Sequence, residues 1–310
     1  MRYANPFLLA VVLVVLGACA GTPSLFSPGG HDRALERQAL DLVNQARAEH
    51  GLPPMRRDPV LSRAAQSHAN DMQSRGYYGH NSPSGRNARD RHDRAGGSRW
   101  RAVAENIARC TRCGGNPEEV DLQHFHRGWM NSPGHRANIL SPHLDSFGFG
   151  VARDGDGMYL VQNFAGPGLP NAYRDGDDLT PLGPDAQARA ALERLNAARA
   201  DAGVPALALG DELSRAVEAA LPRPEDEHFD VRSTAEIARA VPRLRIATLY
   251  GACGACGAAP VAADIRFFLG EWLDRPRYRD RLLDPAATHF GFGLAANAQG
   301  RKVALAATAR

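Results

Sequence analysis

The sequence predicts two tandem α+β domains, and three observations support this. Its 310 residues match two domains of ordinary size. The segment at residues 42–66 recurs at residues 194–218. In each copy helical periodicity comes first and a β-hairpin pattern comes last, an order typical of an α+β sandwich.

The internal repeat is the strongest of these observations. Asn44-Gln-Ala-Arg47 recurs as Asn196-Ala-Ala-Arg199, at an offset of 152 residues. Three later features recur at an offset of 143 residues: Cys110-x-x-Cys113, Trp129 and Phe147-Gly-Phe-Gly150. The second copy has therefore lost residues between its first helices and its CxxC pair, and the chain is a duplication.

The first copy opens with two predicted amphipathic helices. The apolar face of the first, which ends at Gly51, consists of Leu35, Ala39, Leu42, Val43 and Ala46. Asp58-Pro59 supplies an N-cap and a first-turn proline for the second helix. The buried stripe of that helix consists of Leu61, Ala64, Ala65, His68 and Met72. We expect His68 to be a hydrogen-bonded core histidine.

The rest of the copy predicts a third helix and a hairpin. Asn116-Pro117-Glu118-Glu119 starts the helix, with both acids near the positive end of its dipole. The helix runs to Ser132-Pro133, and a short helical turn follows through residues 136–140. Residues 147–152 and 158–164, with a turn of Asp and Gly between them, form the closing hairpin.

The N-terminus has the pattern of an export signal. Arg2 precedes an apolar run from Phe7 to Leu16, which is too short to span a membrane comfortably. Leu16-Gly-Ala-Cys19 resembles a lipobox, in which Cys19 is lipidated and becomes the mature N-terminus. The alternative is an ordinary secretory signal with an accidental cysteine.

These patterns divide the chain into five parts. Residues 1–19 form a lipoprotein signal peptide, residues 20–31 a Pro/Gly/Ser tether, and residues 32–165 the first domain. A linker of residues 166–185 leads to the second domain at residues 186–310.

The charge pattern gives no case for nucleic-acid binding. The formal net charge is only +3, and nearly all of the positive charge is arginine. The arginine-rich segment Arg86–Arg101 also contains Asp90 and Asp93. We therefore expect it to be a solvated loop rather than a site for lipid phosphates.

Three residues of the first copy are candidates for chemistry: His80, Glu105 and His135. Two imidazoles and a carboxylate can bind Zn²⁺ and leave a position open for water, or act as general acid and base without a metal. Residues so far apart in sequence are more often hydrogen-bonded structural groups, so the trio alone is weak evidence.

Five segments of the first copy resemble the bacterial branch of the CAP (SCP) superfamily. They are Leu42-Val-Asn-Gln-Ala-Arg47, Tyr78-Gly-His-Asn-Ser-Pro83, Ala104-Glu-Asn-Ile107, Trp129-Met-Asn-Ser-Pro-Gly-His-Arg-Ala-Asn-Ile-Leu140 and Phe147-Gly-Phe-Gly150. This superfamily includes cysteine-rich secretory proteins, antigen 5 and plant pathogenesis-related proteins. The resemblance covers residues 34–165 strongly and residues 187–309 weakly.

The resemblance implies two tandem α-β-α sandwich domains, each with a central cleft. In the family, two histidines and two acids line this cleft, which binds divalent metal in some members. His80 and His135 match the histidines, and Glu105 matches one acid. The second acid would fall near Ser132, where this chain has no carboxylate. We therefore expect His80, Glu105, Ser132 and His135 to line a ligand site, with His80 and His135 as metal ligands if zinc binds.

The second copy lacks most of these groups. Thr248 stands where Glu105 stands, and Tyr278 stands where His135 stands. His228 is the uncertain counterpart of His80. We expect this copy to be a retained scaffold or interaction module without metal or acid–base chemistry.

The two CxxC pairs are predicted to be local disulfides, Cys110–Cys113 and Cys253–Cys256. Exported proteins favour disulfides, and each copy has a self-contained pair. A shared zinc site and a redox role remain alternatives.

Two functional hypotheses follow. The first is a lipid-anchored protein of the cell envelope, on the periplasmic side of the outer membrane, that binds a lipid, glycan or protein in its first cleft. Ala20 supports this location. In the lipoproteins that the lipobox resembles, an acidic residue after the lipidated cysteine is linked to retention in the inner membrane, and this chain has alanine there. The second is a zinc-assisted hydrolase that uses His80, Glu105 and His135. Whether the protein is an enzyme stays open at this point.

Overall fold

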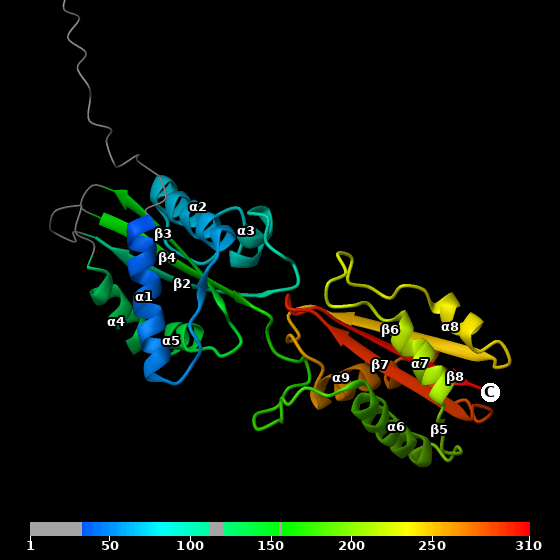
Figure 1. Ribbon diagram of the computed structural model, residues 1–310. Helices are drawn as coiled ribbons and strands as arrows, with labels where there is room; N and C mark the ends of the chain where they lie inside the picture. The colour runs from blue at the N-terminus through cyan, green and yellow to red at the C-terminus, as the bar shows by residue number, and fades with distance from the viewer. Residues whose placement is uncertain (1–32, 112–120, 155–156) are drawn as a thin grey trace, which may run out of the picture. The chain divides into compact units, whose positions relative to one another are not determined.

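The computed structural model describes residues 33–111, 121–154 and 157–310. In the first copy the elements are α1 (Arg33–Glu49), β1 (Arg56–Arg57), α2 (Pro59–Arg75), α3 (Ala88–Arg94), β2 (Ala102–Cys110), α4 (Leu122–Asn131), α5 (Pro133–Ile139), β3 (Ser146–Asp154) and β4 (Gly157–Gly166). Helices and strands mix as an α+β fold requires (Figure 1).

The first sheet has the strand order β1-β3-β4-β2. Strand β1 runs parallel to β3, and the other pairs are antiparallel. The β3–β4 pair, with Phe147 opposite Phe164, confirms the predicted hairpin. Strand β2 lies at one edge of the sheet, so one row of its backbone groups faces away from the other strands.

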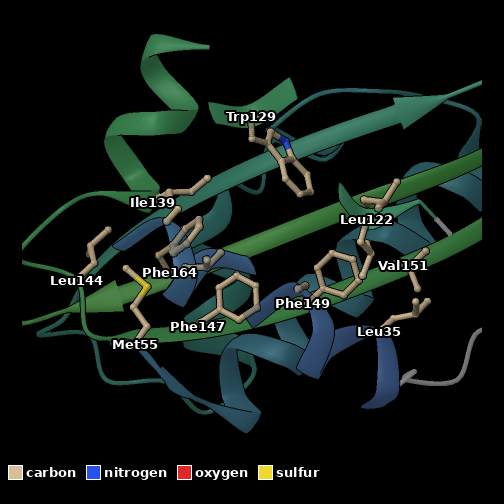
Figure 2. Packing of buried hydrophobic residues seen from close by; sticks show 14 of the residues in the cluster. Leu35, Met55, Leu122, Trp129, Ile139, Leu144, Phe147, Phe149, Val151 and Phe164 are labelled. Carbon is tan, nitrogen blue, oxygen red and sulfur yellow. The ribbon is translucent and has the colours of Figure 1, made fainter. Parts of the chain in front are cut away.

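Helices cover both faces of this sheet. On one face, α1, α4 and α5 contribute Val43, Trp129 and Ile139 to a core with Phe147 and Phe149. Figure 2 shows Trp129 and Ile139 beside these phenylalanines. On the other face, α2 packs against β3 and β4, and its alanines and Met72 form a second cluster. The result is the α-β-α sandwich that the family resemblance implies.

The close packing of α2 on the sheet depends on two glycines. A Cβ atom added to Gly148 would lie 2.2 Å from the backbone nitrogen of Ser62. One added to Gly150 would lie 2.3 Å from that of Gln66. The repeated Phe-Gly-Phe-Gly motif therefore puts phenylalanines on the core face and leaves room for the helix on the other.

The second copy repeats this plan. Its elements are α6 (Pro184–Asp201), β5 (Ala208–Leu209), α7 (Asp211–Ala220), α8 (Thr234–Ala240), β6 (Ile246–Cys253), α9 (Ala262–Leu273), α10 (Pro276–Leu282), β7 (His289–Ala296) and β8 (Lys302–Ala309). The strand order β5-β7-β8-β6 matches the first sheet. Helix α7 has 10 residues where α2 has 17, so the residues lost from the second copy include the end of this helix.

Residues that recur in sequence make the same contacts in both copies. The buried Arg47 donates to the carbonyl oxygens of Pro53 and Ile139, and Arg199 donates in the same way to those of Pro205 and Leu282. Each arginine thereby joins the first helix of its copy to the segment before the hairpin. These contacts of the fold are therefore the same in both copies.

The structure corrects one expectation, and others concern residues that it does not describe. The Arg86–Arg101 segment is not simply a solvated loop, because it contains helix α3, in which Arg91 and His92 are buried. The third helix is described from Leu122, with Asp121 as its N-cap, and its predicted start at Asn116 lies outside the described residues. So do the signal peptide and Cys19. Within the described part of the chain, no helix is long and apolar enough to cross a membrane.

Candidate functional site

The site is built around the edge strand β2. Alternate residues of a strand point to opposite faces of the sheet. Ile107 packs in the cluster under α2, so Glu105 points to the same face. Asn106 points to the other face, towards α5. Neighbouring residues of one strand therefore reach both helical layers.

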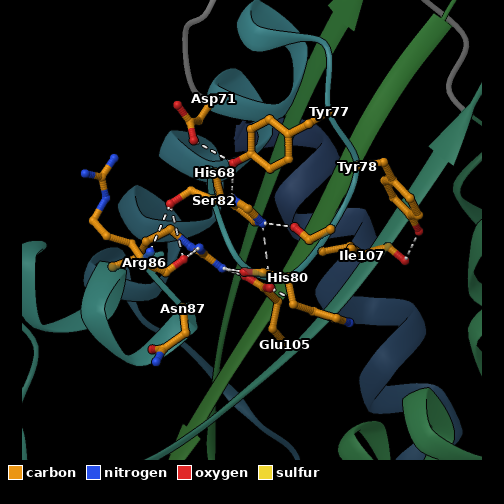
Figure 3. Close-up of polar contacts among 12 residues, drawn as sticks. His68, Asp71, Tyr77, Tyr78, His80, Ser82, Arg86, Asn87, Glu105 and Ile107 are labelled. Atoms are coloured by element: carbon orange, nitrogen blue, oxygen red, sulfur yellow. Dashed lines mark hydrogen bonds and ion pairs between the residues drawn. The ribbon is translucent and has the colours of Figure 1, made fainter. Parts of the chain in front are cut away.

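Glu105 is bonded to His80 and Arg91. Nδ1 of His80 lies 2.9 Å from Oε1 of Glu105 (Figure 3). Arg91 donates to Oε2 of the same carboxylate at 2.7 Å. The side chains of Glu105 and Arg91 are only 3% and 6% exposed, whereas that of His80 is 55% exposed. The carboxylate is thus the buried base of the site, and the imidazole is its accessible tip.

Two further side chains surround the carboxylate. In the amide orientation that satisfies both of its ends, Asn163 of β4 donates to Oε2 of Glu105 at 3.1 Å. His68 of α2 is fully buried, as expected for a core histidine, with Nε2 3.0 Å from the carbonyl oxygen of Gly79. The same nitrogen lies 3.8 Å from Oε1 of Glu105. Burial lowers the pKa of His68, an effect that the Glu105 charge partly opposes.

His135 is held on the other side of β2 by an amide network. Asn106 donates to the backbone carbonyl of His135 at 3.2 Å. Asn138, on α5 with His135, donates to Oδ1 of Asn106 at 2.9 Å and to the carbonyl oxygen of Glu105 at 3.3 Å. Burial lowers the pKa of His135, and the nearby His80 lowers it further. The structure thus joins His80 directly to Glu105 and places His135 on the other side of β2, near enough to His80 for its charge to be felt.

Other side chains close the rest of this edge. The indole Nε1 of Trp129 and the hydroxyl of Tyr78 both donate to the carbonyl oxygen of Ile107, each at 3.1 Å. With the Asn138 bond, these contacts occupy backbone acceptors that another strand would otherwise pair with. Side chains therefore occupy the edge of β2, and a further strand could not pair with these backbone acceptors.

In the second copy the positions that match Glu105 and Arg91 hold no ion pair. Glu105 is opposite Asn163 in the first sheet, and Thr248 is opposite Ala307 in the second. The buried residue at the fourth position of the short helix is Arg91 in α3 and Ile237 in α8. Ile237 and Ala307 belong to one hydrophobic cluster. His228, the residue suggested above as the counterpart of His80, is exposed.

A comparison with known protein families agrees with this architecture. The model of the cysteine-rich secretory protein family, CAP, matches residues 40–164 and 192–308. The two matches coincide with the two copies and together cover most of the chain. The chain belongs to the CAP family.

Relatives of this CAP protein match about one domain's length. The uncharacterized protein YkwD of Bacillus subtilis (strain 168) is 35% identical over 133 residues, 43% of this chain and 48% of YkwD. The uncharacterized membrane protein YlbC of the same strain is 33% identical over 129 residues, 42% of this chain and 34% of YlbC. The chain thus spans about half of YkwD and a third of YlbC.

Among solved structures, an extracellular protein containing a SCP domain from Bacillus anthracis str. Ames is similar to this chain. It shares 30% sequence identity, with a TM-score of 0.37 over 42% of this chain and 40% of that chain.

The donor set of the first CAP domain does not fit a zinc site with three protein ligands. Both oxygens of Glu105 already accept hydrogen bonds, from His80 and Arg91. At the position of the family's second acid stands Ser132, the residue that precedes α5. In the described part of the chain, no group of three or more His, Cys, Asp or Glu residues could hold a metal ion. Two imidazoles remain, fewer than catalytic zinc sites use.

The cysteine pairs have different outcomes. In the second CAP domain, Cys253 and Cys256 are joined in a disulfide. Cys113 lies outside the described residues, so the Cys110–Cys113 pair stays a prediction.

Sequence reasoning missed Arg91 and Asn163 as members of the site. Asn163 follows Gln162 within an otherwise apolar strand, and such a buried amide signals a polar partner. Arg91 gave no such signal, because it stands among other charged residues whose exposure only the fold determines.

Proposed function

We propose that this protein is an extracytoplasmic, lipid-anchored CAP protein whose first domain binds an envelope ligand in the cleft between His80 and His135. The second domain serves as a scaffold. The observation that carries this proposal is the bond from His80 to the buried Glu105 carboxylate, together with the exposure of the rest of the imidazole.

That bond determines what His80 presents to a ligand. A carboxylate only accepts hydrogen bonds, so Nδ1 of His80 carries the hydrogen. In the neutral ring, Nε2 then presents a lone pair to the cleft. His135, whose lowered pKa favours its neutral form, presents a second imidazole. The cleft thus offers hydrogen-bond acceptors to a polar ligand, and among lipid, glycan and protein this favours a glycan with hydroxyl donors.

The zinc-assisted hydrolase is the second candidate. It is favoured by one observation, the carboxylate–histidine pair, because such a pair orients a histidine for metal binding or for acid–base work. It lacks a third ligand, and in the described part of the chain neither histidine makes a hydrogen bond to the hydroxyl of Ser132, the serine that precedes α5. Binding therefore has the better support.

Binding to the peptidoglycan of the envelope tests the proposal. The chain lacking residues 1–19 is titrated with soluble muropeptides in a calorimeter, beside His80→Ala and His135→Ala variants. We expect saturable binding that each variant weakens at least tenfold. Tyr278→Ala, the change at the position matching His135 in the second domain, is the control and should bind as the parent chain does. Equal binding by His80→Ala and the parent would reject the proposed cleft.

A further inference from the structure

Arg91 lies at the base of the proposed ligand cleft and is almost fully buried. It donates to Oε2 of Glu105 at 2.7 Å, to the carbonyl oxygen of His80 at 2.9 Å and to that of Arg86 at 2.9 Å. Its guanidinium therefore does two things: it pairs the one carboxylate of the site, and it holds the backbone of the loop that carries His80.

The charge of the site follows from this pair. In the family pattern two acids accompany two histidines, which makes a site that attracts cations. Here the second acid is absent at Ser132, and the remaining acid is paired with a fixed cation. With both imidazoles neutral, His80, Arg91, Glu105 and His135 carry one negative and one positive charge.

A divalent cation at Nε2 of His80 would therefore meet opposing fields. Glu105 attracts it, while the Arg91 guanidinium repels it from the far side of the same carboxylate. Both charges are buried, so solvent screens them weakly. A neutral ligand with hydroxyl groups meets no such repulsion and still finds the imidazole lone pairs.

We propose that Arg91 is a specificity-determining residue, which makes the cleft of the first domain select a neutral, hydroxyl-rich ligand over a divalent cation. This inference rests on the proposed binding function of the same cleft. It differs from that proposal in assigning the selectivity to one residue that need not touch the ligand.

Zinc titration of an Arg91→Gln variant tests the inference. Glutamine can still donate to Glu105 but removes the positive charge. We expect the variant to bind one Zn²⁺ at least ten times more tightly than the parent chain, and His80→Ala in the Arg91→Gln background to abolish that gain. Arg89→Gln, on the same helix with its side chain 34% exposed, is the matched control and should leave zinc affinity unchanged.

Two results would overturn the inference. One is tight one-to-one zinc binding by the parent chain that is lost in a His80→Ala/His135→Ala variant. The other is a folded Arg91→Gln variant with unchanged zinc affinity. Either result leaves muropeptide binding to be decided by its own titration, so failure of this inference and failure of the proposed function are distinguishable.

If Arg91→Gln does not fold, ¹⁵N NMR of the parent chain with zinc tests the inference instead. One equivalent of Zn²⁺ should leave the ¹⁵N side-chain signals of His80 and His135 unchanged, and a shift of both would contradict the inference.

Discussion

The Nδ1 atom of His80 lies 2.9 Å from Oε1 of Glu105, and Arg91 binds the other oxygen of the same carboxylate. This relationship ties an exposed imidazole to a buried ion pair. It makes Glu105 a positioning residue, because its oxygens serve His80 and Arg91 rather than a ligand.

Replacing Glu105 by glutamine should destabilise the first domain strongly. The change leaves the buried Arg91 guanidinium without a counter-charge, and breaking a buried ion pair in this way costs about 3–5 kcal/mol. Urea unfolding measures the loss. The control is Asp93→Asn, which removes the charge of the more exposed Asp93 carboxylate beside Arg89 and His92 and should cost at most about 1 kcal/mol. Equal costs for the two variants would contradict a paired role for Glu105.

Acidification should destabilise the protein through its buried histidines. Burial lowers the pKa of His68 in the folded state, so the unfolded chain takes up this proton first as the pH falls below about 6.5. The stability contributed by neutral His68 is therefore complete above that pH and is lost below it. His92, His126 and His135 shift in the same direction.

The free energy of unfolding measured by urea from pH 7.5 to pH 5 checks this dependence. His68→Gln should flatten the decline, whereas His228→Gln, at an exposed position of the second domain, should leave it unchanged. A decline that is identical in the parent and His68→Gln would exclude His68 as a source.

The buried pair of Lys302 and Asp264 gives a prediction for the second domain. Nζ of Lys302 lies 2.5 Å from Oδ2 of Asp264, and both side chains are at most 1% exposed. Lys302 pairs with Cys253 in the sheet at the position where Met158 pairs with Cys110 in the first domain. The first domain thus shows that an apolar residue fits this position.

Asp264→Ala should therefore cost about 3–5 kcal/mol, because it leaves the Lys302 ammonium buried and unpaired and removes the hydrogen bond that Asp264 accepts from the backbone nitrogen of Val261. The double variant Asp264→Ala/Lys302→Met should recover most of that loss. Thermal unfolding compares the two. A double variant that is less stable than Asp264→Ala would show that Lys302 stabilises the domain through contacts other than its pairing with Asp264.

Lipid anchoring depends on Cys19 in our account. Cells that express the full chain with labelled palmitate should incorporate label into the protein, and Cys19→Ser should abolish it. The Cys19→Ser protein should also leave the membrane fraction. Absence of label in the parent chain would favour an unlipidated export signal with an accidental cysteine, and unchanged labelling in Cys19→Ser would contradict lipidation at Cys19.

Local signals explain which elements the sequence predicts well. Helix α2 begins where Asp58 accepts hydrogen bonds from the backbone nitrogens of Val60 and Leu61, as an N-cap with a following proline predicts. The hairpin follows from the alternation around Phe147 and Phe149. Strand β2 is missed, because its polar residues Glu105 and Asn106 interrupt the apolar run and are satisfied only by other elements.

The residues of the site likewise divide into those that the sequence marks and those that only the fold reveals. The family motifs mark His80, Glu105 and His135, and the fold bonds His80 to Glu105 and sets His135 near His80. Arg91 is not marked, since an arginine in a charged segment is usually solvated. Its burial arises only because α3 packs beside β2 and places the guanidinium against Glu105. A long-range pairing of this kind has no local signature.

The most direct test of the central claim is ¹⁵N NMR of the histidine side chains, on the chain lacking residues 1–19 and at a pH where imidazoles are neutral. Our account predicts that His80 carries its hydrogen on Nδ1. It also predicts that added muropeptide shifts the signals of His80 and His135 and leaves those of His228 and His289 in place. A hydrogen on Nε2 of His80, or shifts confined to the second domain, would contradict it.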